Sequence, residues 1–314
     1  MICTRISSRS LSLLKASSAI GAMISASIFA NEAVTDGHDA LSDLKSSAEL
    51  VAQLPESAWR RLMPDNTLVM TLPSGELVIE LVEGFAPKHV ENIKLLAKEK
   101  YFDGTSVIRS QDNYVAQWGD TSDINEDEAS AKAKPLGSAK KNIEVEFFQP
   151  LANTAFTKIV SRDAYAKTVG FTNGMPTASD GDKAWLTHCY GMVGVSRGMD
   201  TDSGNGSGLY AVTGHAPRHL DLNVTLVGKA WLGMEHLSSL SRGKGPLGFY
   251  SDPDQYVPIS SVRFLDKDRE IKVMRTDTPE FQKFVELRTH RNEDWFIEPT
   301  GKIELCNVAV PVRH

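Results

Sequence analysis

The sequence predicts a mainly β domain with a few amphipathic helices. Residues 67–72 and 76–81 are rich in Leu, Val, Ile and Thr and flank Pro73-Ser74-Gly75, which is the pattern of a β-hairpin. Residues 107–118 are rich in β-branched and aromatic residues, which favour strands. Apolar runs at 191–196, 208–213 and 224–230 are separated by turn-rich segments and predict three more strands.

Helical spacing appears on both sides of the hairpin. Apolar residues recur every three or four positions from Leu41 to Leu54, and 57–62 predicts another helical turn, so 31–66 is expected to be a helical arm. Pro87 suits the first turn of a helix that carries apolar residues along one side to Ala97. A short helix is expected at 232–240.

Two stretches of the middle of the chain read as surface segments. Residues 121–142 are polar and charged, which predicts an exposed loop. Residues 150–186 have few periodic apolar residues and are interpreted as a long surface insertion. Between them, alternation at 143–147 predicts a strand.

The last part of the chain predicts further elements. Strands are expected at 259–265 and 270–274, followed by a helix from Pro279 to about His290. The run 302–310 predicts a final strand.

The first thirty residues have the layout of a secretory signal peptide. They contain basic residues but no acidic one, run through an apolar segment at 19–30 and end at Ala30 before a polar stretch. The alternative is a membrane anchor, for which the apolar run is short, since a bilayer needs about 20 apolar residues. Cleavage after Ala30 predicts a periplasmic or secreted protein without membrane insertion.

Composition restricts the class of partner. The chain has 41% hydrophobic residues, enough for a packed core, and a net charge of −6 that falls to −9 when the three basic residues of 1–30 are removed. Such a surface repels phosphate backbones, so no nucleic-acid partner is expected.

Two cysteines remain after the predicted signal peptide. Export would permit a disulfide between Cys189 and Cys306, and two buried thiols packed as small hydrophobes are the alternative. The sequence leaves both interpretations open, because it does not supply the distance between the two α-carbons.

One predicted strand carries an arginine and a glutamine that could form a catalytic site. If 107–118 is a single strand, Arg109, Val115 and Gln117 share a face, because positions an even number apart point the same way. A planar, permanently charged guanidinium and an amide would then lie side by side.

The run from Tyr101 to Asp120 resembles the central motif of cyclophilin-type peptidyl-prolyl isomerases, in which an arginine is followed eight positions later by a glutamine shortly before Gly-Asp. Sequence on either side is similar to the family in the same order, and the resemblance covers roughly residues 68–240. The matching segments are 75–81, Ala86-Pro87-Lys88, 90–92, Leu96-Ala97, 205–207, His219-Leu220-Asp221 and 227–229.

The resemblance implies a closed antiparallel β-barrel of about eight strands, capped by helices. That domain would occupy 67–314, behind the helical arm, with insertions at about 121–142, 150–186 and 241–301. A strand near 302–307 would complete the barrel.

The resemblance also implies site residues. Arg109 would be the catalytic arginine and Gln117 its partner, while Tyr114, Val115, Tyr210 and Leu220 would form the proline pocket. Ser196 and Arg197 match an alanine and an asparagine that contact substrate, and His219 stands where a tryptophan is often found. Ile108, Gly208 and Val224 depart from the family pattern, so the chain resembles a divergent, exported bacterial-like member of the family.

The activity implied is cis-trans isomerisation of X-Pro bonds in unfolded or exported polypeptides. It needs no cofactor, metal or nucleophile, because the reaction is rotation about an amide bond with a barrier of roughly 20 kcal/mol. A guanidinium can donate to the proline nitrogen as the amide twists. The alternative is a cyclophilin-like peptide-binding module or chaperone with weak catalysis.

Three other motifs are weaker. Gly194-Val-Ser-Arg-Gly198 fits a nucleophile elbow, but turn residues and not a helix follow its serine. The Asp200-Thr-Asp202 start of the next loop lacks the glycine and glutamate of a calcium loop. His215 and His219 have a helical metal-ligand spacing, which Pro217 between them opposes.

Overall fold

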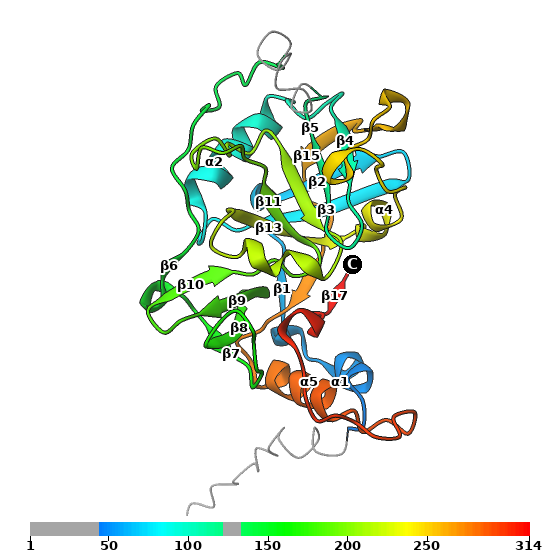
Figure 1. The fold of residues 1–314 in the computed structure, drawn as a ribbon. Coiled ribbons are helices and arrows are strands. Elements are labelled where there is room, and N and C mark those ends of the chain that lie inside the picture. Colours follow the sequence, from blue (N-terminus) through cyan, green and yellow to red (C-terminus); the bar gives the residue numbers. More distant parts are fainter. Residues whose placement is uncertain (1–43, 122–132) are drawn as a thin grey trace, which may run out of the picture. The chain divides into compact units, whose positions relative to one another are not determined.

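The computed structural model describes residues 44–121 and 133–314. Strands are the main regular secondary structure of these residues, and they form three sheets (Figure 1). The strands are β1 (Trp59–Arg61), β2 (Thr67–Leu72), β3 (Gly75–Leu81), β4 (Ser106–Ser110), β5 (Val115–Gly119), β6 (Gln149–Pro150), β7 (Thr157–Lys158), β8 (Thr168–Thr172), β9 (Met175–Ser179), β10 (Lys183–Leu186), β11 (Met192–Val195), β12 (Leu209–Val212), β13 (Leu226–Leu232), β14 (Val257–Pro258), β15 (Ser261–Phe264), β16 (Lys272–Met274) and β17 (Val312–Arg313).

The helices are fewer and mostly short. The α-helices are α1 (Ser47–Gln53), α2 (Pro87–Lys98), α4 (Met234–Ser238) and α5 (Pro279–His290). The 3₁₀ turns are η2 (Glu56–Ala58), η3 (Pro64–Asn66), η5 (Leu151–Asn153), η6 (Ala216–Leu220), η7 (Pro246–Gly248), η8 (Pro253–Gln255) and η9 (Leu305–Asn307). Within the described residues no helix is both long and apolar enough to cross a membrane.

The main sheet has nine antiparallel strands in the order β14-β4-β5-β12-β11-β13-β3-β2-β15 and curls strongly. It is open, so the expected closed barrel of about eight strands is wrong. One segment, 257–264, supplies both edges: β14 pairs with β4, and β15 pairs with β2. The chain crosses between the edges at Ile259 and Ser260, whose amides donate to Thr105 and Thr71, and no strand ladder joins β14 to β15 in the described part of the chain.

The predicted hairpin and first helix are confirmed. β2 and β3 pair from Thr67–Glu80 to Leu72–Gly75, and Gly75 adopts φ 148°, a value that L side chains rarely take. Pro87 begins α2, which buries Val90, Ile93 and Leu96 in a core with the inner face of the main sheet.

The 150–186 segment is not a loose surface insertion, as the sequence had suggested. It contains a five-stranded antiparallel sheet in the order β6-β10-β9-β8-β7. All five residues of β9 are buried, so the strand shows no polar and apolar alternation that would reveal it. Phe171 and Trp185 pack in a second core with Val115 and Tyr210 of the main sheet.

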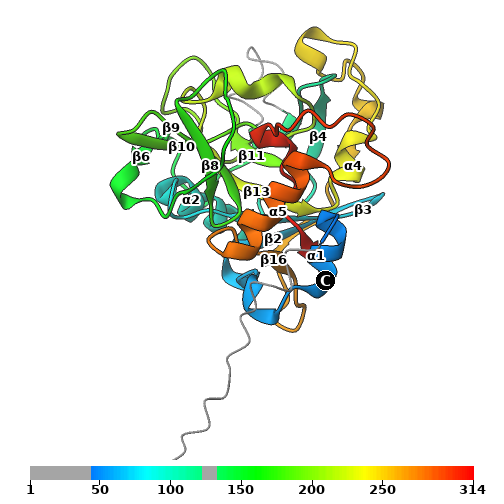
Figure 2. The ribbon, with the colours of Figure 1, turned by 90° about the horizontal axis from the view of Figure 1, so that it is seen from below.

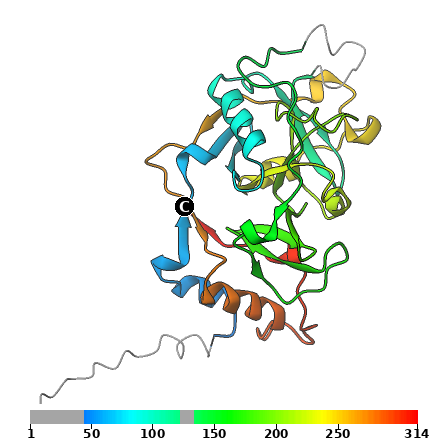
Figure 3. The ribbon, with the colours of Figure 1, turned by 90° about the vertical axis from the view of Figure 1, so that its left-hand side faces the viewer.

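The N-terminal arm and the end of the chain form one layer. β1, β16 and β17 make a small antiparallel sheet, and α1 lies beside α5 (Figures 1 and 2). Figure 3 shows the insertion sheet between the main sheet and α5. The helix predicted to begin near Leu41 begins at Ser47, because Ser46 caps it and forms a capping box with Glu49.

Three local predictions are wrong for related reasons. The helical turn expected over 57–62 is present only as the 3₁₀ turn η2, which ends at Ala58; β1 follows, because Trp59 pairs with Met274, which is distant in sequence. Residues 143–147 have no strand partner, and the Ile143 amide donates to Asp202 instead. Residues 302–310 contain η9 and no strand, so no strand there completes the main sheet. The expected signal peptide, residues 1–30, lies outside the described residues.

Candidate active site

Arg109 and Gln117 do lie side by side, but on two strands and not one. The chain turns between β4 and β5, where Asn113 has φ 50°, and the two strands pair in antiparallel register with Arg109 opposite Gln117. A β-bulge at Ile108 shifts this register. The single strand expected over 107–118 is therefore a hairpin, and cross-strand pairing brings the two side chains together.

The same row continues across the sheet. Gln117 stands opposite Tyr210 of β12, and Tyr210 stands opposite Gly194 of β11. Directly opposed residues share a face of a sheet, so three predicted site residues line one row.

The Arg109 guanidinium is held by three acceptors. Nη1 donates to Gln117 Oε1 at 3.0 Å, Nη2 donates to Gln111 Oε1, and Nε donates to the Leu247 carbonyl at 2.7 Å. Burial lowers the pKa of Arg109 from its ordinary value, but a guanidinium remains charged in proteins. A guanidinium has five N–H groups, so about two remain for a substrate.

Aromatic rings flank this cation. The guanidinium carbon lies 5.1 Å from the ring centre of Phe249 and 5.8 Å from that of Tyr114. The Tyr114 hydroxyl lies 3.0 Å from His219 Nε2, and the two rings stack. These contacts define an aromatic wall in which His219 is the exposed member.

Gly194 provides the space for the Tyr210 ring. A Cβ built on Gly194 would lie 2.3 Å from the Tyr210 hydroxyl and 2.4 Å from the ring carbon that bears it. Tyr210 is 5% exposed and Val115 is 2% exposed, so the base of the expected pocket is packed into the core shared with the insertion sheet.

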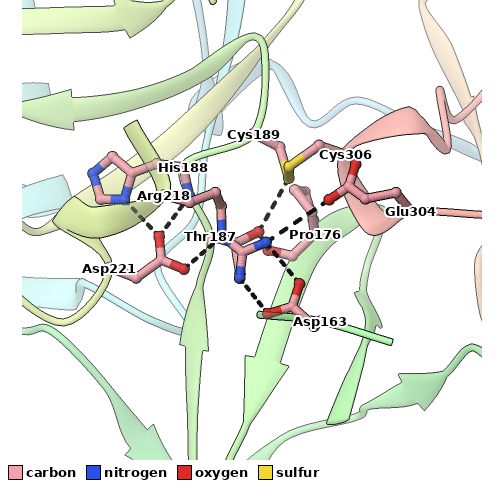
Figure 4. The surroundings of a disulfide bond; sticks show 9 residues. All are labelled: Asp163, Pro176, Thr187, His188, Cys189, Arg218, Asp221, Glu304 and Cys306. Carbon is pink, nitrogen blue, oxygen red and sulfur yellow. Dashed lines mark hydrogen bonds and ion pairs between the residues drawn. A yellow bond between two sulfur atoms is a disulfide. The ribbon is translucent and has the colours of Figure 1, made fainter. Parts of the chain in front are cut away.

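A buried polar network extends from the Tyr210 hydroxyl (Figure 4 shows the part beyond Tyr210). His188 Nε2 lies 2.8 Å from that hydroxyl, and His188 Nδ1 lies 2.9 Å from Asp221 Oδ1. Because the ionised carboxylate only accepts, Nδ1 carries the proton and Nε2 accepts from Tyr210. Burial lowers the pKa of His188 and raises the pKa of Tyr210, which keeps both groups neutral.

Arg218 connects this network to the insertion. Its Nε donates to Asp221 at 2.8 Å, and its two terminal nitrogens form a bidentate pair with Asp163, both at 2.9 Å. Burial alone would raise the pKa of Asp163, but the guanidinium holds it below its ordinary value. The η6 turn, which carries Arg218 and His219, is thereby fixed to the insertion.

Cys189 and Cys306 form a disulfide beside this network (Figure 4). The bond links the residue after His188 to η9 in the C-terminal segment, across a sequence separation of 117. Glu304, near the same bond, lies 4.0 Å from Arg218. The C-terminal segment is thus fastened to the chain that supports Tyr210.

Ser196, Arg197 and Leu220 are not among the described residues that hydrogen-bond to the Arg109 guanidinium or stack on it. The Ser196 amide donates to the carbonyl of Gly208, at the end of the ladder that holds Tyr210. Arg197 donates to the carbonyls of Asn223 and Gly198, so it fastens two loops together. Leu220 ends η6 next to His219.

Several site residues could not be found by local sequence reasoning. Leu247 and Phe249 contact Arg109 although they are about 140 positions away in the sequence. Their segment runs along β4, where the amides of Gly243 and Tyr250 donate to the carbonyls of Ser110 and Ile108. Gln111, two residues from Arg109, is the one contact that proximity in sequence could have suggested.

The structure does not form the sites that the nucleophile-elbow and histidine-pair motifs would require. Irregular chain and not a helix follows Ser196, so the strand-turn-helix of a nucleophile elbow is not formed. His219 is in a 3₁₀ turn and stacks on Tyr114. Within residues 44–121 and 133–314, no cluster of three acidic, His or Cys side chains is suited to a metal ion.

Comparisons with known proteins agree on one family. Residues 67–264 match the family model described as cyclophilin type peptidyl-prolyl cis-trans isomerase/CLD. Proteins named probable peptidyl-prolyl cis-trans isomerase from Brucella suis and Brucella melitensis are 25% identical over 197 residues, which is 62% of this chain and 81% of each relative. The crystal structure of cyclophilin AquaCyp293 from Hirschia baltica is similar with a TM-score of 0.60 and 25% identity, covering 81% of this chain and 93% of that one.

Proposed function

Because this chain belongs to the cyclophilin-type peptidyl-prolyl cis-trans isomerases, we propose that Arg109 and Gln117 catalyse isomerisation of X-Pro bonds in exported polypeptides. The proposal rests on the hydrogen bond from Arg109 to the directly opposed Gln117; together with the bonds to Gln111 and Leu247, it leaves about two of the five guanidinium N–H groups for the substrate.

The chemistry follows from the twisted amide. Rotation about the X-Pro bond removes amide resonance, and the proline nitrogen regains a lone pair. A guanidinium that is already oriented stabilises this lone pair more than the planar amide, and such differential binding lowers the barrier. Gln117, Gln111 and Leu247 orient Arg109, so little reorganisation is needed during the reaction.

Aromatic side chains supply the binding surface for the substrate. Tyr114, His219 and Phe249 form the wall near the guanidinium, and Tyr210 and Val115 form the packed base. Ser196, Arg197 and Leu220 belong to loops next to this row, where they would contact residues flanking the proline. Stacking of Tyr114 on His219 orders the exposed wall before a peptide arrives.

Action on exported polypeptides is supported by two features of the chain. The layout of residues 1–30 predicts a signal peptide, and a disulfide persists most readily in an oxidising compartment such as the periplasm. Fractionation of cells that produce the chain tests this part: recovery with cytoplasmic markers and an intact N-terminus would exclude it.

A protease-coupled assay on short X-Pro peptides tests the catalytic assignment. We expect Arg109→Ala to lower kcat/KM at least about tenfold, a loss of ~1.4 kcal/mol of transition-state stabilisation. Arg275→Ala is the matched control, since Arg275 pairs with Asp277 on the surface. Equal turnover in Arg109→Ala and the parent would exclude Arg109 as the catalytic residue.

A peptide-binding module with weak catalysis is the second candidate. The occupation of Nε by Leu247 and of Nη2 by Gln111 favours it, because these contacts leave fewer donors for a substrate. Peptide binding in the parent without measurable turnover would support this candidate.

A further inference from the structure

A basic pocket lies away from Arg109, between the insertion and the C-terminal segment. It has a volume of about 790 Å³ and is lined by residues 158–162 and 167, by Arg288 and Arg291 at the end of α5 and just after it, and by residues 296, 298–304 and 307. Ser161 joins the two walls through a hydrogen bond from its hydroxyl to the Ile303 carbonyl at 2.8 Å. The basic residues that line the pocket are Lys158, Arg162, Lys167, Arg288, Arg291 and Lys302. Its acidic lining residues are Glu298 and Glu304.

The positive charge in this pocket has little compensation from the protein. None of the six cations lies within 4.0 Å of a carboxylate belonging to a described residue. Glu304 is oriented towards Arg218 instead, at 4.0 Å. This local excess of positive charge stands out in a chain whose net charge is −6.

Arg288, in the pocket wall, also has few partners for its charged side chain. One terminal nitrogen donates to the Asn307 carbonyl at 3.1 Å, while the buried Nε has no hydrogen-bond partner in the described part of the chain. Burial and the neighbouring charge of Arg291 lower the pKa of Arg288. The Glu293 carboxylate partly opposes this shift, but neither Arg288 nor Arg291 forms an ion pair within 4.0 Å among the described residues, so the two neighbouring arginines favour an anionic ligand.

Apolar side chains project into solvent from the same two walls. Val160, which lines the pocket, is 93% exposed, and Trp295 and Ile297, on either side of the lining residue Phe296, are 81% and 100% exposed. A free inorganic anion would gain nothing from these side chains. A surface that is anionic outside and apolar beneath would contact both kinds of side chain, and tryptophan is enriched at such interfaces.

We propose that this basic pocket, together with Val160, Trp295 and Ile297, docks the protein on anionic phospholipid bilayers. The cations contact lipid phosphates, and the three apolar side chains enter the interfacial region. Basic residues near an anionic surface are attracted to it, and salt weakens this attraction. None of the residues lining this pocket contacts Arg109, so lipid binding here does not depend on catalysis.

Sedimentation with lipid vesicles tests the proposal on the full chain. One vesicle is phosphatidylcholine alone, and the other contains equal parts of phosphatidylcholine and phosphatidylglycerol. We expect stronger binding to the anionic vesicle, weakened by salt. Arg162→Glu combined with Lys302→Glu should reduce that binding at least about tenfold. Lys98→Glu combined with Lys141→Glu, two exposed cations outside the pocket, is the matched control and should bind like the parent.

Tryptophan fluorescence supplies a second measurement. Binding to the anionic vesicle should shift the emission of the parent to shorter wavelength, and Trp295→Phe should lose most of that shift while keeping its isomerase activity. Equal binding of all variants to both vesicles would overturn the proposal, because residues 1–30 or nonspecific adsorption would then account for it. Binding of poly-glutamate or inorganic phosphate at the pocket without vesicle binding would also overturn it.

Discussion

Gln117 stands directly opposite Arg109 on the paired strands β5 and β4, and its side-chain oxygen accepts a 3.0 Å hydrogen bond from guanidinium Nη1. Gln117 is 7% exposed, so packing by neighbouring residues restricts the orientations of its side-chain amide. The strand pairing therefore fixes the orientation of a flexible arginine before any peptide binds.

Removing this acceptor should weaken catalysis without unfolding the protein. We expect Gln117→Leu to lower kcat/KM about fivefold, because a typical intramolecular hydrogen bond contributes ~1 kcal/mol. The assay is the protease-coupled one. Gln282→Leu, at an exposed position of α5, is the control, and a fall of the same size in both variants would contradict the role of Gln117.

Gly194 offers a test of the Tyr210 position. In Gly194→Ala the new methyl group would overlap the Tyr210 hydroxyl end, so the ring must move. We expect lower peptide affinity, seen as a higher KM, together with a lower melting temperature. Gly84→Ala is the control, because a Cβ there meets nothing within 4 Å. An unchanged KM in Gly194→Ala would show that Tyr210 does not shape the site.

The Asp163–Arg218 pair should contribute strongly to stability, because the two side chains are only 3% and 6% exposed. Asp163→Ala leaves a buried guanidinium short of one partner, and such changes cost about 3–5 kcal/mol. Asp277→Ala breaks a surface pair and should cost at most about 1 kcal/mol. Urea unfolding measures both. Losses of equal size would show that the link between the insertion and η6 is not structurally important.

Stability should fall on mild acidification because of His188. Burial lowers the pKa of folded His188 below its ordinary value of 6.5, so below about pH 6.5 the unfolded chain binds a proton that the folded chain does not. The free energy of unfolding is then highest above pH 6.5 and decreases as pH falls towards the folded pKa. His188→Gln should flatten this dependence, whereas His290→Gln, at an exposed position, should retain it. A parent protein equally stable at pH 7 and pH 5 would contradict this expectation.

Breaking the Cys189–Cys306 bond should destabilise the C-terminal segment. The loop it closes has a sequence separation of 117, for which the chain-entropy model gives a contribution of about 5 kcal/mol as an upper value. Cys189→Ala combined with Cys306→Ala should lower the free energy of unfolding by a measurable part of this amount. Stability equal to that of the parent, with and without reductant, would show that the bond has no such effect.

Local sequence was sufficient where neighbours in the chain also contact each other in space. The 67–81 hairpin, α2 from Pro87 and α5 from Pro279 to His290 form as predicted, because turn residues and helical apolar spacing act over a few positions. The Arg109 and Gln117 motif also predicted their proximity, although the reason given, a shared strand, was wrong.

Contacts between distant segments decided the rest. The insertion sheet was missed because its central strands β8 and β9 are buried on both faces and lack alternation, while its edge strands β6 and β7 have only two residues each. Leu247 and Phe249 reach Arg109 only because 243–250 runs along β4, and the sheet stays open because 257–264 supplies both edges. The sequence by itself determined the local elements and the residues available for chemistry. The tertiary structure determined which of them meet, because long-range strand pairing and burial depend on the whole folded chain and not on a local pattern.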